Sequence, residues 1–219
     1  MYLGIDTTNN NLCYALLDDN RVLFYENLYP CSNAAEILPP KIAQLFQEFS
    51  ITIHDIKKII SVTGPGGFSG VRIGTAFVTG LSANTKVDII GISSLEAAGF
   101  SIENPQKNSI IIACLDARRD GIYLGLYQDD YTPLITDSVI HIKELQSLLV
   151  AYQNKPYYLS GHGHAIIQPM LDTNLLLNKI DHTMAEIFIP QALLKKFPKD
   201  NTPIYLRQPD AKLPKNKIT

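Results

Sequence analysis

The same order of residues occurs twice in this chain, which constrains its fold more than any other feature. Tyr2 to Asp6 forms a short apolar run that ends in aspartate, and a polar turn and a second apolar run, Leu12 to Leu17, follow it. Ile110 to Asp116 repeats this order, with a turn and then Ile122 to Tyr127. Apolar runs of this length separated by polar turns predict antiparallel strands. The repetition predicts two copies of one ββ(β)αβα plan.

Further elements complete each predicted copy. We expect strands at Arg21 to Asn27, Ile56 to Val62 and Tyr157 to Ser160, and helices at Ala34 to Phe49, Ser69 to Ala83 and Ile142 to Tyr152. Pro39 and Pro40 leave the start of the first helix open, because proline is tolerated only in the first turn. Ser69 is the expected N-cap of the second helix.

The predicted fold is therefore α/β, with two lobes that meet at a cleft, as in actin and the sugar kinases (the ASKHA fold). The polar stretch from Glu103 to Asn108 is the expected joint, so the lobes are predicted at 1–105 and 106–219. A chain of 219 residues is long enough for two modest cores.

The charge, the first residues and the cysteines of the chain limit the classes of protein to which it can belong. The formal net charge is −2 and the basic residues are scattered, whereas a protein that holds nucleic acid by itself is expected to have a basic face. The first residues have no basic stretch followed by a long apolar one, so we expect a cytoplasmic protein without a membrane span. The three cysteines cannot all pair, and we expect buried free thiols.

The glycine-rich stretch GPGGFSGVRIG, residues 64–74, does not match either common phosphate-binding motif. A P-loop requires a lysine near its end, and no lysine occurs between Lys58 and Lys86. The dinucleotide fingerprint requires a third glycine where Ser69 stands. The stretch therefore predicts a tight turn from a strand into a helix.

That helix contains Gly70, Gly74 and Gly80, although each glycine costs about 1 kcal/mol relative to alanine. Close approach of another backbone is the expected compensation. Two interpretations stay open: the helix packs closely on the protein's own sheet, or part of it faces a second protein.

Several stretches together resemble one family. They are LGIDT at 3–7, EILPPKI at 36–42, GPGGFSGVRIGTAFVTGLS at 64–82, GISSLEA at 91–97, DARRDGIYLGLY at 116–127 and PIYLRQPDA at 203–211. In this order they resemble the bacterial TsaB (YeaZ) family of tRNA threonylcarbamoyladenosine biosynthesis proteins. The most specific part is the motif loop, Gly64, Pro65, Gly66, Gly67, Phe68 and Arg72.

The resemblance implies a non-catalytic partner of the transferase TsaD, which makes the t6A modification at adenosine 37 of tRNAs that read codons beginning with A. It implies a heterodimer with TsaD through the two helices of the first lobe, a homodimer when alone, and contact with the ATPase TsaE. Contact with tRNA is implied only through the complex. The implied interface residues are Leu38, Ile42, Leu45, Gly70, Val71, Gly74, Phe77, Val78 and Leu81.

One position departs from the family pattern. Many members carry a histidine near Asn33, which resembles the metal-binding helix of the catalytic relative, and this chain has none there. The departure favours the non-catalytic interpretation. No cofactor is implied for the chain itself, although weak ATP or ADP binding in the complex is compatible with the family.

The residues themselves leave one enzymatic alternative. Asp6 and Asp116 end corresponding strands, and in sugar kinases such aspartates orient magnesium or act as a base. A small-molecule kinase is therefore the rival prediction, although an aspartate after a strand often only accepts a hydrogen bond from the amide two residues on. The five histidines lack the paired spacing of metalloproteases, so we predict no metal site and no catalytic residue. Arg72 is expected to reach a carboxylate, because a cation is unfavourable in a first helical turn.

Overall fold

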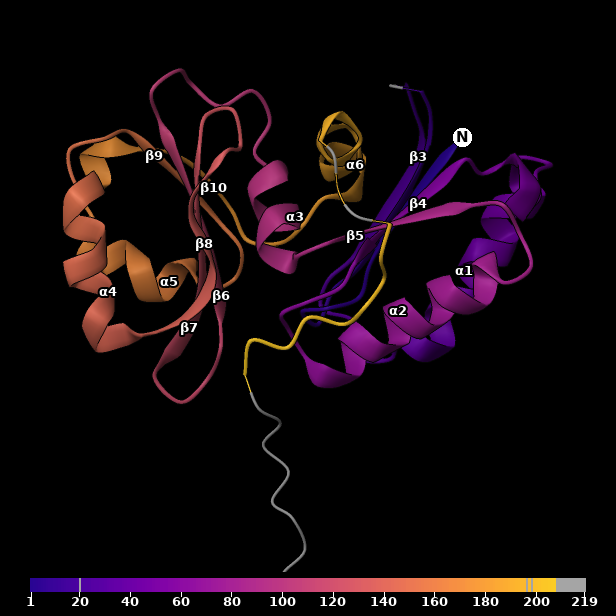
Figure 1. Cartoon of the computed structure of the whole chain (residues 1–219), viewed down its shortest axis with the longest axis horizontal. Helices are drawn as coiled ribbons and strands as arrows, with labels where there is room; N and C mark the ends of the chain where they lie inside the picture. The colour runs from indigo at the N-terminus through magenta and orange to yellow at the C-terminus, as the bar shows by residue number, and fades with distance from the viewer. Residues whose placement is uncertain (20, 196, 198, 208–219) are drawn as a thin grey trace, which may run out of the picture.

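The computed structural model describes residues 1–19, 21–195, 197 and 199–207, and it contains two five-stranded sheets (Figure 1). The last residues of the PIYLRQPDA stretch, 208–211, and the remainder of the predicted second lobe beyond them lie outside the described residues.

The first sheet has the order β3-β2-β1-β4-β5. Its strands are β1 (Tyr2–Asp6), β2 (Leu12–Asp18), β3 (Arg21–Leu28), β4 (Lys58–Val62) and β5 (Asp88–Ile92). The first three strands pair antiparallel, and β4 and β5 continue the sheet in parallel. Along β2, Leu12, Tyr14 and Leu16 face one apolar cluster and Cys13, Ala15 and Leu17 face another, so the strand is buried on both faces.

The second sheet has the order β10-β9-β6-β7-β8, which is the order of the first sheet read from the other edge. Its strands are β6 (Ile110–Asp116), β7 (Gly121–Gln128), β8 (Pro133–His141), β9 (Tyr157–Ser160) and β10 (Leu176–Ile180). The pairing types also correspond, with an antiparallel β6-β7-β8 meander and parallel β9 and β10. The predicted duplication and the two-lobed α/β fold are confirmed.

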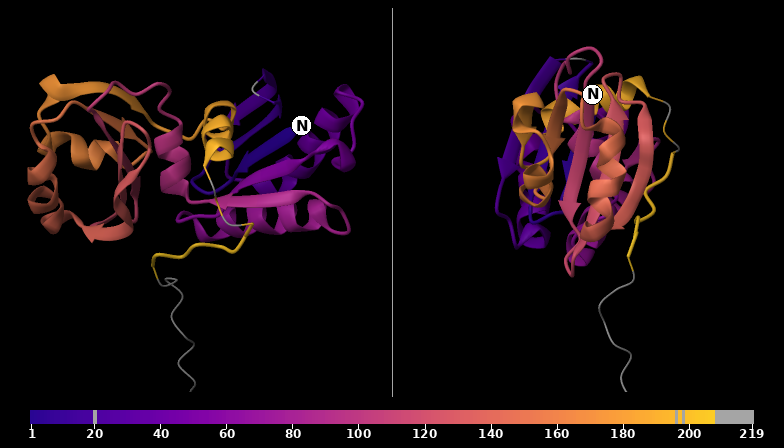
Figure 2. Two further views of the ribbon diagram at one scale, coloured as in Figure 1. Left: turned by 45° about the horizontal axis from the view of Figure 1, so that its top comes forward. Right: turned by 90° about the vertical axis from the view of Figure 1, so that its left-hand side faces the viewer.

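Helices separate and cover the sheets in layers (Figures 1 and 2). They are α1 (Ala34–Glu48), α2 (Phe68–Ser82), α3 (Ser94–Phe100), α4 (Ile142–Leu149), α5 (His164–Ile167) and α6 (Ala185–Leu194), with short 3-10 turns at Ile53–Asp55, Val150–Tyr152, Gln168–Met170 and Thr173–Leu175. The pair α1 and α2 covers the outer face of the first sheet, and α4 and α5 cover the outer face of the second. Helices α3 and α6 lie between the sheets, where they share a single apolar core with both.

The structure settles how the two outer helices of the first lobe begin. Helix α1 begins at Ala34, the first residue of the predicted range, and contains Pro39 and Pro40 on its exposed side. Helix α2 is capped by Gly67, and the predicted N-cap Ser69 is an exposed residue of the first turn. Instead of a side-chain cap, the structure has a backbone anchor at this place, where the Gly67 amide donates to the Thr8 carbonyl at 2.7 Å.

The end of the chain returns to the first lobe. Helix α6 packs against β1 and β2, and the Ile204 amide donates to the carbonyl of Thr63, the residue that follows β4. The predicted boundary near residue 105 does separate the two sheets. The predicted second lobe at 106–219 is nevertheless wrong for α6 and for residues 199–207, because their apolar and polar contacts include the first lobe.

Two smaller expectations concern burial and membranes. The three cysteines are free and buried, as predicted. Among the described residues, no helix is both long and apolar enough to cross a bilayer.

Candidate functional site: the motif loop, the helix face and the inter-lobe cavity

The glycines of the motif loop pack against the turn that follows β1. A Cβ atom at Gly66 would lie 2.6 Å from the Thr8 carbonyl oxygen, and one at Gly70 or Gly74 would collide with Thr7. The Thr7 hydroxyl donates to the Gly70 carbonyl at 2.7 Å. Real Cβ atoms do not approach an oxygen so closely, so these positions require glycine. The group that approaches the helix closely is therefore part of this chain: the Thr7 backbone at Gly70 and the Thr7 side chain at Gly74.

The residues predicted to form a partner interface mostly face inward. Buried in the isolated chain are Leu38, Ile42, Leu45, Val71, Gly74 and Val78, while Gly70, Phe77 and Leu81 are partly buried. The prediction that the buried six offer a surface is wrong. The apolar stripe of a helix that covers a sheet is turned toward that sheet, so only the opposite side of α1 and α2 remains for a partner.

That opposite side, here called the outer face, consists mainly of small and uncharged residues. Exposed on α1 are Ala35, Glu36, Pro39, Pro40, Ala43, Gln44, Gln47 and Glu48, and on α2 Phe68, Ser69, Arg72, Ala76, Thr79 and Gly80. Glu36 and Glu48, the charged residues among those of α1, lie near its two ends. Gly80 differs from the other helix glycines, because a Cβ atom there would meet nothing within 4 Å. Its small size is therefore not explained by packing within the chain.

Within the part of the chain that the structure describes, Arg72 lies among aromatic rings instead of beside a carboxylate. Its guanidinium carbon lies 3.7 Å from the centre of the Phe68 ring, and its Nε donates to the Tyr205 hydroxyl at 3.3 Å. The Phe68 and Tyr205 rings lie 5.3 Å apart. The expected carboxylate partner is thus replaced by a cation–π contact, which orients the charge without an ion pair.

Asp6 is buried beneath the turn that it holds. Its Oδ1 accepts from the amide and the hydroxyl of Thr8, both at 2.7 Å, and its Oδ2 accepts from the Thr183 hydroxyl. Only 1% of the residue is exposed. Burial raises the pKa of Asp6 above its ordinary value of 3.8, and the hydrogen bonds from Thr183 and Thr8 oppose this effect. The local hydrogen bond two residues on is confirmed, and the side chain of Asp6 does not face an open cleft, which the rival kinase function would require.

Asp116 has the same local bond but a different environment. Its Oδ1 accepts from the Arg118 amide at 2.7 Å, and the side chain is exposed. The two aspartates are thus brought to the junction of the lobes, as the duplication predicts. They do not share an accessible site.

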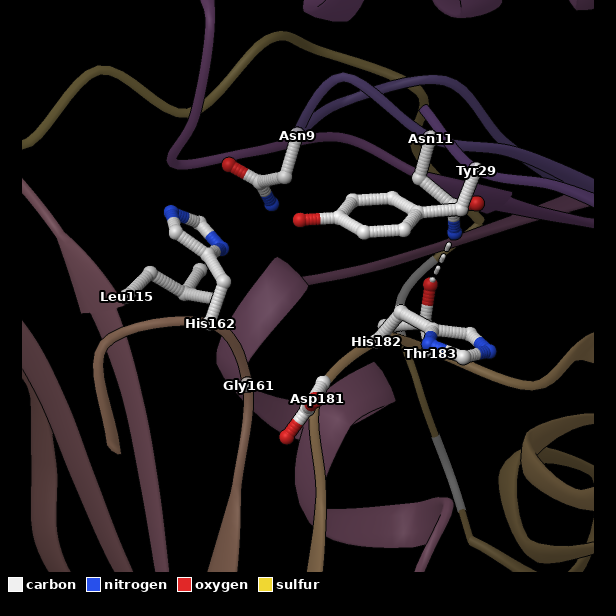
Figure 3. Close-up of a pocket in the computed structure, with 9 residues that line it drawn as sticks. All are labelled: Asn9, Asn11, Tyr29, Leu115, Gly161, His162, Asp181, His182 and Thr183. Atoms are coloured by element: carbon white, nitrogen blue, oxygen red, sulfur yellow. Dashed lines mark hydrogen bonds between the residues drawn. The ribbon is translucent and has the colours of Figure 1, made fainter. Parts of the chain in front are cut away.

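A cavity between the lobes lies beside these turns (Figure 3). Asn9, Asn11 and Tyr29 line it from the first lobe, and Leu115, Gly161, His162 and the segment 181–183 line it from the rest of the chain. Its volume is about 10 Å³, which suffices for about one water molecule. Small-molecule sites usually have about 300–1,000 Å³. In this arrangement of the lobes the cavity is too small for a nucleotide.

Residues on opposite sides of this cavity contact each other directly. The Asn11 side-chain amide donates to the Thr183 hydroxyl at 3.1 Å, and the Tyr29 ring stacks on His182 at 5.6 Å. Burial lowers the pKa of His162 below 6.5, although the charges of Asp116 and Asp6 oppose it. Tyr29 and Thr183 were missed by the sequence reasoning, because neither belongs to a motif and each acts through residues distant in sequence.

The geometry also bears on metal binding. Among the described residues, no group of three or more histidine, cysteine, aspartate or glutamate side chains is arranged to hold a metal ion. His164 pairs with Asp181 at 2.6 Å. The loop that contains His162 and His164 thus contributes one side-chain contact to a carboxylate.

Known proteins resemble this chain in sequence and in fold. Residues 32–196 match the family model described as TsaD: tRNA N6-adenosine threonylcarbamoyltransferase. The tRNA threonylcarbamoyladenosine biosynthesis protein TsaB of Bacillus subtilis is 27% identical over 180 residues, which cover 78% of this chain and 74% of that protein.

Solved structures extend the likeness. YeaZ from Pseudomonas aeruginosa superposes with a TM-score of 0.78 at 21% identity, covering 94% of this chain and 99% of that one. A protein assigned as an N-acetylglucosamine kinase from Porphyromonas gingivalis gives a TM-score of 0.50 at 9% identity, over 88% of this chain and 99% of that chain. At such identities these superpositions establish the fold alone, which is that of the actin and sugar-kinase class. The chain belongs to the tRNA N6-adenosine threonylcarbamoyltransferase family and, within it, to the TsaB (YeaZ) proteins.

Proposed function

We propose that this chain works in t6A biosynthesis as a non-catalytic partner subunit of a TsaD-type transferase, which modifies adenosine 37 of tRNAs that read codons beginning with A. Membership of the TsaB proteins supports the pathway. The observation that carries the non-catalytic role is the state of Asp6, whose two oxygens are both engaged inside the protein.

The rival kinase function requires Asp6 to reach magnesium or phosphate. To do so the carboxylate would have to give up its bonds to Thr8 and Thr183, and the inter-lobe cavity would have to expand well beyond about 10 Å³. Breaking hydrogen bonds to a buried charged group costs roughly 1.5–3 kcal/mol each. These costs favour a docking function over phosphoryl transfer.

The outer face of α1 and α2 is the proposed docking surface for the transferase. Its exposed residues are mostly small or uncharged, and depletion of charge is characteristic of the centre of protein interfaces. Gly80 would allow a helix of the partner to approach the α2 backbone closely. The same face would support a homodimer when the transferase is absent.

The wider assembly follows from the same proposal. The ATPase TsaE joins the pair, tRNA is contacted only through the complex, and the chain has no cofactor of its own. Weak binding of ATP or ADP within the complex is compatible with this role. The site of action is the cytoplasm.

Isothermal titration of this chain with the TsaD homologue of the same organism tests the proposal. We expect association with the unaltered chain, and Gly80→Leu should weaken it at least about tenfold, because a bulky side chain at an interface centre separates the two surfaces. The matched control is Ala151→Leu, which enlarges an exposed small residue on the second lobe.

Two results would contradict the proposal. One is no association of the unaltered chain, and the other is ATP-dependent phosphoryl transfer by the chain alone that disappears in Asp6→Asn. Equal binding by Gly80→Leu and Ala151→Leu would show that the partner docks away from the outer face.

A further inference from the structure

The C-terminal segment 199–207 contacts both lobes, first the edge of the first lobe and then the second lobe. After α6 the chain passes beside β5 and α2 and reaches the second lobe at its lower end in Figure 1. The left view of Figure 2 shows the same course. We propose that residues 199–207 form a strap that holds the lobes in their closed arrangement, with Arg207 as the latch on the second lobe.

The first half of the strap is bonded to the edge of the first lobe. Lys199 pairs with Asp88 at 2.8 Å, and the Ile204 amide donates to the Thr63 carbonyl at 2.7 Å. The Asn201 side-chain amide donates to the Thr75 carbonyl of α2 at 2.8 Å. These contacts fix the strap on β5, on the end of β4 and on α2.

Two glycines of the first lobe make room for the strap. A Cβ atom at Gly64 would lie 2.6 Å from the Ile204 carbonyl oxygen, and one at Gly91 would collide with the Asp200 carbonyl. Gly64 opens the motif loop, and Gly91 opens the GISSLEA stretch. One glycine of each motif thus leaves space for a segment more than 100 residues away in sequence.

The strap next joins the motif loop through aromatic contacts. Tyr205 accepts from Arg72 and packs beside Phe68, and the Leu206 side chain contacts the core between the sheets. The strap therefore spans from the α2 surface to the junction of the lobes.

Arg207 completes the connection at the turn that follows β6. Its Nη1 donates to the carbonyls of Ala117 and, at 3.1 Å, of Arg118. The φ angles of Arg118, Arg119 and Asp120 are 60°, 49° and 58°, a left-handed run that non-glycine residues adopt only at a cost. A guanidinium that binds two of the carbonyls of this turn stabilises that conformation. The latch thus acts on the one turn of the second lobe that corresponds to the turn after Asp6.

Hydrogen–deuterium exchange of the full chain tests the strap. Arg207→Ala should make exchange about tenfold faster in peptides that cover 117–122 and those that line the inter-lobe cavity at 161–163, because hydrogen bonds to a charged group contribute that much to local closure. Peptides that cover β1 and β4 should be unchanged. Arg21→Ala, which removes an exposed arginine at the far edge of the first sheet, is the control.

A second pair of variants tests the other end of the strap. Gly91→Ala should displace the strap at Asp200 and reproduce the faster exchange at 117–122, whereas Gly80→Ala adds a methyl group in open space and should not. Unchanged exchange at 117–122 and 161–163 in both Arg207→Ala and Gly91→Ala would overturn the proposal. A uniform rise over both sheets would also overturn it, because the strap would then be part of the general core.

Discussion

The turns after Asp6 and Asp116 have the same local structure but different surroundings. Each aspartate follows a central strand and accepts a hydrogen bond from the amide two residues on, at 2.7 Å in both cases. The first turn is covered by the motif loop and by Thr183, and Asp6 is buried, whereas Asp116 is exposed. The repeated sequence therefore specifies the turn, while contacts from distant segments decide whether its carboxylate is accessible.

The largest expected difference is between Asp6→Ala and Asp116→Ala. Removing the Asp6 carboxylate leaves the Thr8 amide, the Thr8 hydroxyl and the Thr183 hydroxyl without their acceptor, and should lower the free energy of unfolding by about 3 kcal/mol. Asp116→Ala removes one bond at an exposed site and should cost less than about 1 kcal/mol. Urea unfolding of both variants measures the difference, and equal losses would show that burial does not distinguish the turns.

A smaller effect on stability is expected from variants of the helix α2 that covers the turn after Asp6. Gly74→Leu introduces a side chain against the Thr7 hydroxyl and should lower the free energy of unfolding by about 2 kcal/mol, within the usual cost of overpacking. At Gly80 on the same helix a Cβ atom would meet nothing within 4 Å, and Gly80→Leu should leave stability unchanged or raised by up to about 1 kcal/mol. Thermal unfolding of the two variants measures the difference. Equal stability of Gly74→Leu and Gly80→Leu would show that the contact with Thr7 does not require glycine at position 74.

The smallest expected effect is on the pH dependence of stability. Because burial raises the pKa of Asp6 above 3.8, the folded chain holds this proton to higher pH than the unfolded chain does. The contribution of Asp6 to the free energy of unfolding should therefore fall as the pH rises from about 3.8 through its folded pKa. Asp6→Asn removes this fall, so the free energy of unfolding of the unaltered chain minus that of the variant should decrease as the pH rises above about 4. A difference that increases over this range would mean that hydrogen bonding to the carboxylate outweighs its burial.

Much of the fold was predictable from local pattern. The strands β1, β6 and β9 have the predicted bounds, because each is a continuous apolar run with a polar residue or glycine after it. The bounds of α1 and α2 were predicted to within a residue, because their apolar positions recur at helical spacing.

Other elements were not predicted from the same patterns. Strand β5 is short and contains Gly91, and β10 is an edge strand whose central residues are exposed, so neither shows a strong periodicity. Helix α3 is buried on every side and lacks a polar face, although Ser93 and Glu96 do form a capping box that could have marked its start. The candidate site was predicted less well than the fold, since the apolar side of α1 and α2 was taken for the partner surface.

Local sequence preferences account for the duplicated strand order, the aspartate turns and the glycine positions, because strand and turn preferences act between residues close in the chain. Only the tertiary structure decided that Gly70 and Gly74 accommodate the turn after β1, that Gly64 and Gly91 accommodate the strap, and that Asp6 is closed off by Thr183. A glycine in the sequence can indicate that another segment packs closely at that position, but it does not identify the segment. That identity depends on contacts between residues far apart in the chain, which no local pattern contains.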